Sequence, residues 1–133
     1  MDPIFIIPLL LISLVSFPSW GVSMDDLIER EGRYFQKFTI KPFTGEVFGI
    51  KSGKIENGKK VGRWISYHST GHPREITHYI NGRRNGFSEW YDESGRFIGK
   101  GNLINGKKEG LWELKEGQHT ARGNFKNGKE EGL

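Results

Sequence analysis

The chain has 133 residues, enough for about one domain, and its 20 Lys and Arg against 16 Asp and Glu give a formal net charge of +4. It contains no cysteine, which excludes disulfides, thiolate metal sites, a cysteine nucleophile and lipid attachment through cysteine. The chain has 19 glycines and 13% aromatic residues. A flexible glycine linker lacks aromatics, so this composition indicates many turns that join short aromatic strands.

The N-terminus carries an apolar run at residues 4–15. This run is too short to cross a membrane, because a spanning helix needs about 20 apolar residues. The sequence "SFPSWGVS" follows and offers cleavage after Gly21 or Ser23. Although no Lys or Arg precedes the run, we predict that residues 1–21 form a cleaved secretory signal, with an uncleaved anchor as the alternative. The protein is then exported to a periplasmic or extracellular location, where it can associate with a membrane.

Residues 22–33 are predicted to form a short helical lead-in. Ser23 and Asp26 resemble a capping box, and Asp25 and Asp26 would lie at the positive end of a helix that reaches about Arg30. Such a helix would cover the first edge strand of a following sheet, or it would serve as a docking element.

Residues 34–133 are predicted to form a repeat domain. Asn-Gly pairs begin at positions 57, 81, 105 and 127, and another glycine lies ten residues before each of the last three. Asn-Gly is the strongest two-residue signal for a β-hairpin, because both residues tolerate the positive φ of a type I′ turn. We therefore predict an all-β fold, an elongated antiparallel β-meander of hairpin repeats with a partial last unit.

Each unit is predicted to contain an Asn-Gly turn, a strand, a glycine-containing turn and a second strand. The strands are placed at 63–68 and 74–80 in the first unit, and at 87–92 and 97–104 in the second. The third unit is two residues shorter between its glycines, which keeps every side chain on its face, whereas losing one residue would invert the strand. The fourth unit is either a terminal cap guarded by two glutamates or a truncated repeat.

These units resemble the MORN repeat, and more closely the bacterial MORN-variant repeat that is often found in exported proteins and often filed as an antitoxin component. The resemblance covers residues 34–133 and is carried by Gly62, Trp64, Tyr67, Gly71, Gly86, Trp90, Tyr91, Gly95, Gly110, Trp112 and Gly117. The second unit departs from the pattern, since Ser88 stands where the first and third units have tryptophan, and Phe87 is expected to substitute. The third unit has no tyrosine before its turn. The resemblance implies an elongated sheet that interacts with lipids or proteins, and an antitoxin role is implied by it alone.

The aromatic side chains of the repeat allow two interpretations. The set that recurs in register is Trp64, Tyr67, Tyr79, Phe87, Trp90, Tyr91, Trp112 and Phe125. We predict that these residues form the core, because a single hairpin cannot bury enough apolar surface by itself. The alternative is an exposed aromatic strip for a glycan or a peptide.

Basic pairs follow three of the Asn-Gly turns and are the candidate binding residues. The pairs are Lys59 and Lys60, Arg83 and Arg84, and Lys107 and Lys108. Two strands per unit at about 4.8 Å each would space the pairs by about 10 Å along one edge of the sheet. Such a row would engage anionic lipid headgroups or an acidic partner, with about 1 kcal/mol from each cation. The alternative is that the charges only keep the turns solvated and discourage edge-to-edge aggregation.

A metal site is the weaker hypothesis for the histidines of the first unit. His68 and His78 lie symmetrically about a turn that contains His72, and Glu75 is a further possible ligand. The spacing matches no metal-binding motif, so we predict surface histidines and no metal or other cofactor.

Catalytic motifs give no support for an enzyme. The sequence has no G-x-S-x-G, no H-E-x-x-H and no phosphate-binding glycine loop followed by a helix. Glu89 and Glu113 occupy equivalent strand positions, which describes a repeated face better than an acid–base pair. We therefore predict a non-catalytic module for protein–protein interaction or scaffolding, which binds through the sheet face or its open edge. Peripheral binding to an anionic membrane is the alternative, and the sequence indicates neither nucleic acid nor a small-molecule substrate.

Overall fold

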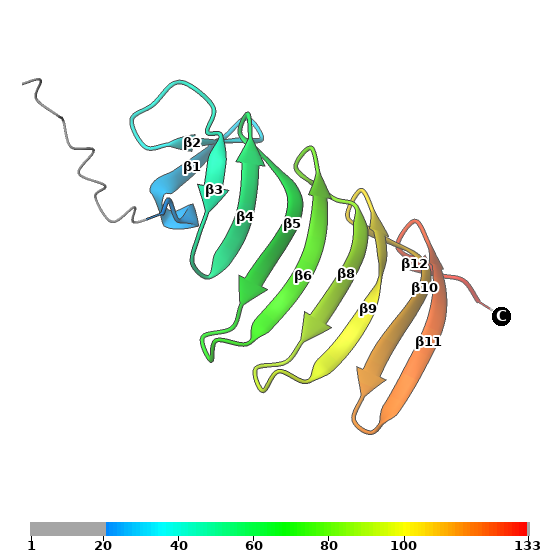
Figure 1. The fold of residues 1–133 in the computed structure, drawn as a ribbon. Helices are drawn as coiled ribbons and strands as arrows, with labels where there is room; N and C mark the ends of the chain where they lie inside the picture. Colours follow the sequence, from blue (N-terminus) through cyan, green and yellow to red (C-terminus); the bar gives the residue numbers. More distant parts are fainter. Residues whose placement is uncertain (1–20, 133) are drawn as a thin grey trace, which may run out of the picture.

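The structure is a computed structural model that describes residues 21–132. A two-stranded sheet of β1 (Leu27–Arg30) and β2 (Arg33–Gln36) precedes a ten-stranded antiparallel sheet. The strands of the larger sheet are β3 (Gly45–Val47), β4 (Lys51–Glu56), β5 (Lys59–Tyr67), β6 (Pro73–Ile80), β7 (Arg83–Arg84), β8 (Gly86–Tyr91), β9 (Phe97–Ile104), β10 (Lys107–Glu116), β11 (His119–Lys126) and β12 (Lys129–Glu130). Their spatial order follows the chain, with β7 paired to β6, so that successive hairpins lie side by side in one long sheet (Figure 1). The predicted all-β meander is confirmed.

The predicted signal segment falls almost entirely outside the described residues, which begin at Gly21. Within residues 21–132, no helix has the length and apolarity needed to cross a membrane.

The predicted helical lead-in is wrong beyond its first turn. A single 3-10 turn, η1 (Met24–Asp26), comes directly after Ser23, whose backbone N–H donates to the Asp26 carboxylate at 2.8 Å. This bond and a second one from the Ser23 hydroxyl hold the pKa of Asp26 below its ordinary value. The chain then extends, because β1 pairs along its whole length with β2 and buries Leu27 at its start. The capping residues therefore begin a turn, but strand pairing determines the conformation of the residues after it.

The four Asn-Gly pairs form the predicted left-handed turns. The φ angles of Asn57, Asn81, Asn105 and Asn127 lie between 47° and 51°, and those of the glycines next to them lie between 79° and 84°. The turns also bond to one another, since the amides of Gly82, Gly106 and Gly128 donate to the carbonyls of Lys60, Arg84 and Lys108, each in the preceding unit. These bonds fix the register between consecutive units at the upper edge of the sheet.

Replacing Asn81 by valine is expected to lower the free energy of unfolding by about 1–2 kcal/mol, since a β-branched residue is strained at positive φ. Urea denaturation measures the change. The control is Asn81→Gly, which should leave stability almost unchanged, because glycine adopts positive φ without a steric penalty. Equal losses in the two variants would show that the asparagine side chain, and not its backbone geometry, matters at this turn.

The ten-stranded sheet has two distinct faces. Side chains alternate between faces along each strand, and one face, here called the aromatic face, carries Ile55, Trp64, Tyr79, Trp90, Leu103, Trp112 and Phe125. On this face Trp90 stacks on Trp112 with ring centroids 4.8 Å apart, and Phe125 meets Trp112 edge to face. The other face is here called the outer face. The predicted aromatic core is thus present, but only on one side of the sheet.

The core is concentrated at the N-terminal end of the aromatic face. There Leu27, Val47, Ile55 and Trp64 form a buried cluster, against which Val22, Met24, Tyr34, Phe43 and Tyr79 pack. The carbonyl of Val22 also accepts a hydrogen bond from the backbone N–H of Phe48. Together, Val22 and the β1–β2 hairpin therefore cover the first end of the sheet.

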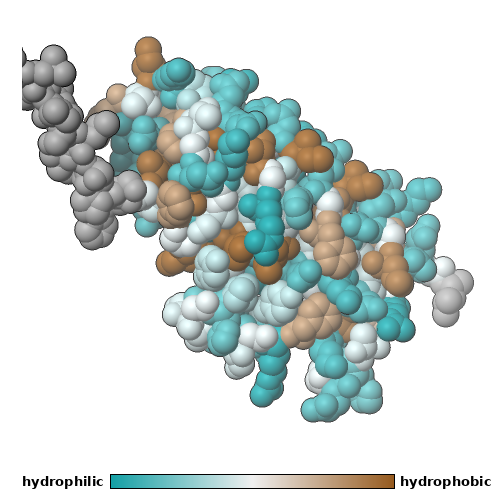
Figure 2. All heavy atoms as spheres, in the orientation of Figure 1, coloured by the Kyte–Doolittle hydropathy of each residue, from teal (hydrophilic) through white to brown (hydrophobic). Residues whose placement is uncertain are grey.

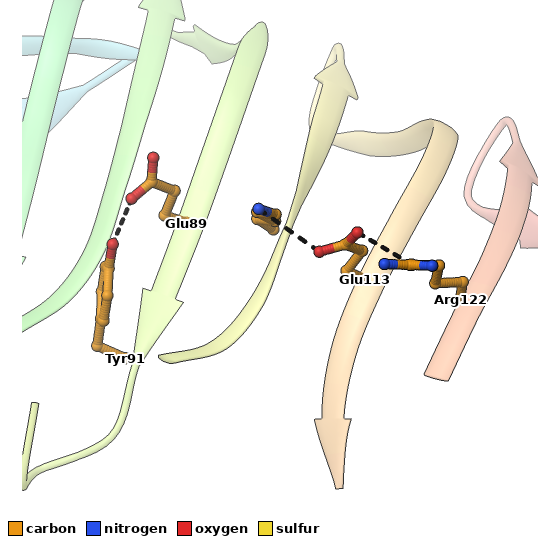
Figure 3. A network of polar contacts seen from close by, with 5 residues as sticks. Glu89, Tyr91, Glu113 and Arg122 are labelled. Carbon is orange, nitrogen blue, oxygen red and sulfur yellow. Dashed lines mark hydrogen bonds and ion pairs between the residues drawn. The ribbon is translucent and has the colours of Figure 1, made fainter. Parts of the chain in front are cut away.

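Three aromatic residues do not join the core as predicted. Tyr67 is absent from the buried cluster and from the residues packed against it, and it occupies the same repeat position as Tyr91. Phe87 does not substitute for the missing tryptophan, because it lies on the outer face and is 45% exposed, while its neighbour Ser88 takes the buried position. Tyr91 also faces outward, and its hydroxyl donates to the Glu89 carboxylate (Figure 3). Neighbouring residues of a strand face opposite sides of the sheet, so Phe87 cannot share a face with Ser88, nor Tyr91 with Trp90.

The shortened third unit behaves as predicted. The loops that join β5 to β6 and β8 to β9 comprise residues 68–72 and 92–96, whereas β10 and β11 are joined by the two residues 117 and 118. The deletion therefore falls in the turn, and Phe125, which follows it, still lies on the aromatic face with Trp112.

Candidate functional site

The structure divides each predicted basic pair between the two faces of the sheet. The strands start directly after the turns, so neighbouring residues of a pair point in opposite directions. Lys60, Arg84 and Lys108 lie on the aromatic face, whereas Lys59, Arg83 and Lys107 lie on the outer face. The single basic row predicted from the sequence is therefore two rows, which have different surroundings.

The lysines of the inner row lie over aromatic rings. The ammonium of Lys60 is 4.6 Å from the ring centroid of Trp64 and 5.1 Å from that of Tyr79, with Tyr34 slightly farther away. Lys108 is placed equivalently over Trp90, Trp112 and Phe125. Because an aromatic face attracts a cation, solvation of the turns alone does not account for the placement of these two lysines.

Arg84, the middle member of the inner row, is held by a carboxylate. Its Nε and Nη2 donate to the two carboxylate oxygens of Glu75 at 2.8 and 3.1 Å. Its guanidinium also lies 5.6 Å from the ring centroid of Tyr79. The hydrogen bond to Glu75 raises the pKa of Arg84, so its charge is fixed.

Lys60 lies in a positive environment that disfavours its charge. Partial burial, together with the positive charges of Lys51 and Arg84, lowers the pKa of Lys60 below that of a free lysine. Burial also raises the pKa of the neighbouring Tyr79 hydroxyl, which keeps this group neutral. Among the described residues, no carboxylate forms an ion pair with Lys60.

These groups surround a small open depression of about 70 Å³ on the aromatic face. Its lining residues are Lys51, Lys60, Trp64, Ile65, Ser66, Glu75, Thr77, Tyr79 and Arg84. Sequence analysis singled out Lys60 and Arg84 but missed Lys51, Ser66 and Thr77, which come from neighbouring strands and share no motif. The one available signal was the break in the repeat between the first and second units, at Thr77 and Ser88.

The outer row lies along an exposed edge that we call the outer ridge. In the β-ladder Arg83 is paired with Ile80, and Lys107 with Ile104. The same pairing places Glu56 opposite Lys59 and Lys126 opposite Lys129, so the full ridge is Glu56, Lys59, Ile80, Arg83, Ile104, Lys107, Lys126 and Lys129. Ile80 is 64% exposed and Ile104 is 52% exposed. Figure 2 shows such apolar side chains among hydrophilic ones along the row of turns.

The ridge cations are not neutralised within the protein. In the part of the chain that the structure describes, Lys59, Arg83 and Lys107 form no ion pair. The outer row thus retains its charge for a partner, and it alternates this charge with exposed apolar side chains.

Below the ridge, the outer face carries a network of ion pairs. Glu113 joins Lys100 at 3.5 Å to Arg122 at 3.1 Å, and Glu89 accepts the hydroxyl of Tyr91 (Figure 3). Partial burial opposes ionisation of Glu113, but the two cations outweigh it and hold the pKa of Glu113 below its ordinary value. Glu113 is therefore a bridging carboxylate and is not poised to exchange a proton near neutral pH.

One histidine of the first unit, His68, links neighbouring hairpins. The Nε2 of His68 lies 2.8 Å from the carbonyl oxygen of Tyr91, and the hydroxyl of Thr70 donates to the carbonyl of Glu93 at 2.7 Å. Among residues 21–132, no three His, Cys, Asp or Glu side chains are placed to share a metal ion.

Comparison with protein-family models finds no model that matches the chain, and comparison with curated proteins finds no match. The resemblance to the MORN-variant repeat therefore stays a prediction from the sequence.

Proposed function

We propose that this protein is an exported, non-catalytic binding module that docks on an anionic membrane surface through the outer ridge. The alternation of Arg83 and Lys107 with exposed Ile80 and Ile104 carries this proposal. Cations attract anionic headgroups, and apolar side chains beside them can enter the boundary between headgroups and acyl chains.

The regular spacing of the ridge suits an extended partner surface. Consecutive units advance by two strands, so the cations succeed one another at about 10 Å along the edge. Each cation near an anionic surface contributes about 1 kcal/mol. Full burial of an isoleucine side chain contributes about 1.5–3 kcal/mol, and partial insertion of each isoleucine contributes a fraction of this. The combined energy is enough for reversible association and falls as salt screens the charges.

The triple variant Lys59→Glu, Arg83→Glu and Lys107→Glu is expected to abolish sedimentation with vesicles that contain phosphatidylserine. Wild-type protein should sediment with these vesicles at low salt and dissociate from them at high salt. It should not bind neutral vesicles. Ile80→Ser with Ile104→Ser should weaken binding by about tenfold without changing its salt dependence, because it removes only the inserted apolar groups.

A charge-matched triple at the opposite turns is the control for the vesicle experiment. Arg74, Arg96 and Lys115 are exposed near the lower loops, and their replacement by Glu changes the net charge by the same amount. Vesicle binding should survive in this control. Equal loss in both triples would mean that only net charge matters, and absence of wild-type binding at low salt would rule out membrane docking.

A protein partner is the second candidate, favoured by the outer face below the ridge. Phe87 and Leu111 are 45% and 55% exposed there, beside the ion pairs of Glu113. Exposed apolar groups within a polar rim are typical of protein interfaces. A pull-down from the cell envelope with wild-type protein and a Phe87→Asp, Leu111→Asp variant tests this hypothesis, since a specific partner must be lost from the variant.

A further inference from the structure

The depression on the aromatic face gathers positive charge that the protein does not balance. Lys51, Lys60 and Arg84 contribute three cations, and Glu75 is the one carboxylate in the lining. Glu75 is occupied by Arg84, which uses Nε and Nη2 for this pair and retains the two N–H groups of Nη1. The site therefore keeps a net charge of about +2 and free donors on all three cations.

Hydroxyl groups add to the donors of this depression. Thr77 belongs to the lining and is only 3% exposed, and its buried hydroxyl has no hydrogen-bond partner among the described residues. A buried polar group without a partner costs about 1–3 kcal/mol, so such a group in a lining marks a place where a ligand can supply the missing bond. Ser66 supplies a second hydroxyl on the neighbouring strand.

We propose that this depression binds the phosphate group of a small ligand, with Lys60 at its centre and Lys51 and Arg84 on either side. The donors come from β4, β5 and β7 and therefore approach from several directions. A tetrahedral dianion presents acceptor oxygens in all of these directions, whereas a planar carboxylate presents two on one side. Phosphate also matches the net positive charge of the lining. This site lies on the opposite face from the outer ridge and is independent of membrane docking.

The third unit shows what distinguishes the first. Lys108 lies over three rings as Lys60 does. However, the basic position of the next turn, which is Arg84 beside the first unit, is Glu130 beside the third. Leu114 replaces the hydroxyl of Ser66 at the equivalent strand position. A phosphate near Lys108 would thus meet a carboxylate and an apolar side chain, so we assign no anion site there.

The first experiment is calorimetric titration of the full chain with inorganic phosphate at low ionic strength. Lys60→Met preserves the side-chain stem over the rings and removes the charge, and it should weaken binding by at least tenfold, since a charge-assisted hydrogen bond is lost. Lys51→Met, at an exposed position that should not affect folding, is expected to weaken binding by about threefold to tenfold. The matched control Lys108→Met should leave the affinity unchanged.

The source of the phosphate is decided by repeating the titration with glycerol 3-phosphate and with vesicles that contain phosphatidate. In each case the difference between wild type and Lys60→Met isolates the depression from the outer ridge. If the Lys60-dependent binding is tightest for glycerol 3-phosphate, the ligand is a soluble phosphate ester. If it is tightest for the vesicles, the ligand is a lipid headgroup. The proposal is overturned if none of the three probes binds saturably, or if Lys60→Met and Lys51→Met bind as tightly as wild type.

Discussion

Replacement of Gly101 by alanine is expected to lower the free energy of unfolding by about 3 kcal/mol. A Cβ at this position would lie 2.3 Å from the ring of Trp112, far inside van der Waals contact. Trp112 cannot move away, since it is fully buried, its Nε1 donates to the carbonyl of Asn102 at 3.0 Å, and Trp90 stacks on its ring. Forcing an atom into such packing costs about 1–3 kcal/mol, and the rigid ring places this site at the upper end.

Gly123→Ala is the matched control, because Gly123 occupies the same repeat position two strands farther along. A Cβ there meets the Glu130 carboxylate, the far end of a flexible side chain that can move. We expect this variant to keep the stability of the wild type, or to gain some tenths of a kcal/mol from the reduced entropy of the unfolded chain. Urea denaturation compares the two variants, and similar losses at both positions would show that glycine is needed for strand conformation and not for the tryptophan.

The hairpin meander was predictable because its causes are local. An asparagine and a glycine at positive φ make a turn wherever they occur between strands, so the spacing of Asn-Gly pairs carries the positions of the hairpins. The shortened third unit was equally predictable, since a two-residue deletion preserves the faces of a strand. Both conclusions depend only on residues that are neighbours in the sequence.

The lead-in failed as a prediction because its competing interaction is not local to the cap. Ser23 and Asp26 do form the contacts expected of a helix start. The outcome was decided by the pairing of β1 with β2 and by the burial of Leu27 against Val47 and Ile55, which the capping pattern does not contain. Capping is worth about 1 kcal/mol, less than the burial of a leucine side chain.

The candidate sites were only half predictable for a related reason. The basic residues were visible in the sequence, but the predicted strand began at residue 63, whereas β5 begins at Lys59. Only a strand that extends back to the turn separates Lys59 from Lys60 by face. Which residues surround Lys60 then depends on the pairing of three strands, and Lys51 and Thr77 carry no motif that would have brought them to attention.

The glycines that determine the packing were also hidden among those that form turns. Gly53 and Gly101 lie within strands, and each supports a tryptophan eleven residues later in the chain. The ring stands directly on the glycine backbone, so this pair is the packing unit of the repeat. Where the first unit meets the second, both members differ together, with Thr77 in place of the glycine and Ser88 in place of the tryptophan.

Ser88→Trp alone is expected to destabilise the protein by about 3 kcal/mol, and adding Thr77→Gly should restore stability to within about 1 kcal/mol of the wild type. The new ring would collide with the Thr77 side chain, as Trp112 would collide with a Cβ at position 101. With glycine at position 77 the ring obtains the support that it has in the other units. The double variant also removes two buried hydroxyl groups that lack hydrogen-bond partners among the described residues, each of which costs about 1–3 kcal/mol.

A double-mutant cycle measured by urea denaturation tests this exchange, with Thr77→Gly as the second single variant. Thr77→Gly alone should also destabilise, because it leaves a space beside Ser88 and puts a flexible glycine in a strand. We expect a coupling energy of at least about 2 kcal/mol between the two sites, well above the few tenths found for independent positions. Additive effects would show that this part of the sheet is packed by other contacts, and that Thr77 and Ser88 act independently. Strong coupling would instead show that a tryptophan on a glycine is one exchangeable packing unit, which Thr77 and Ser88 replace together.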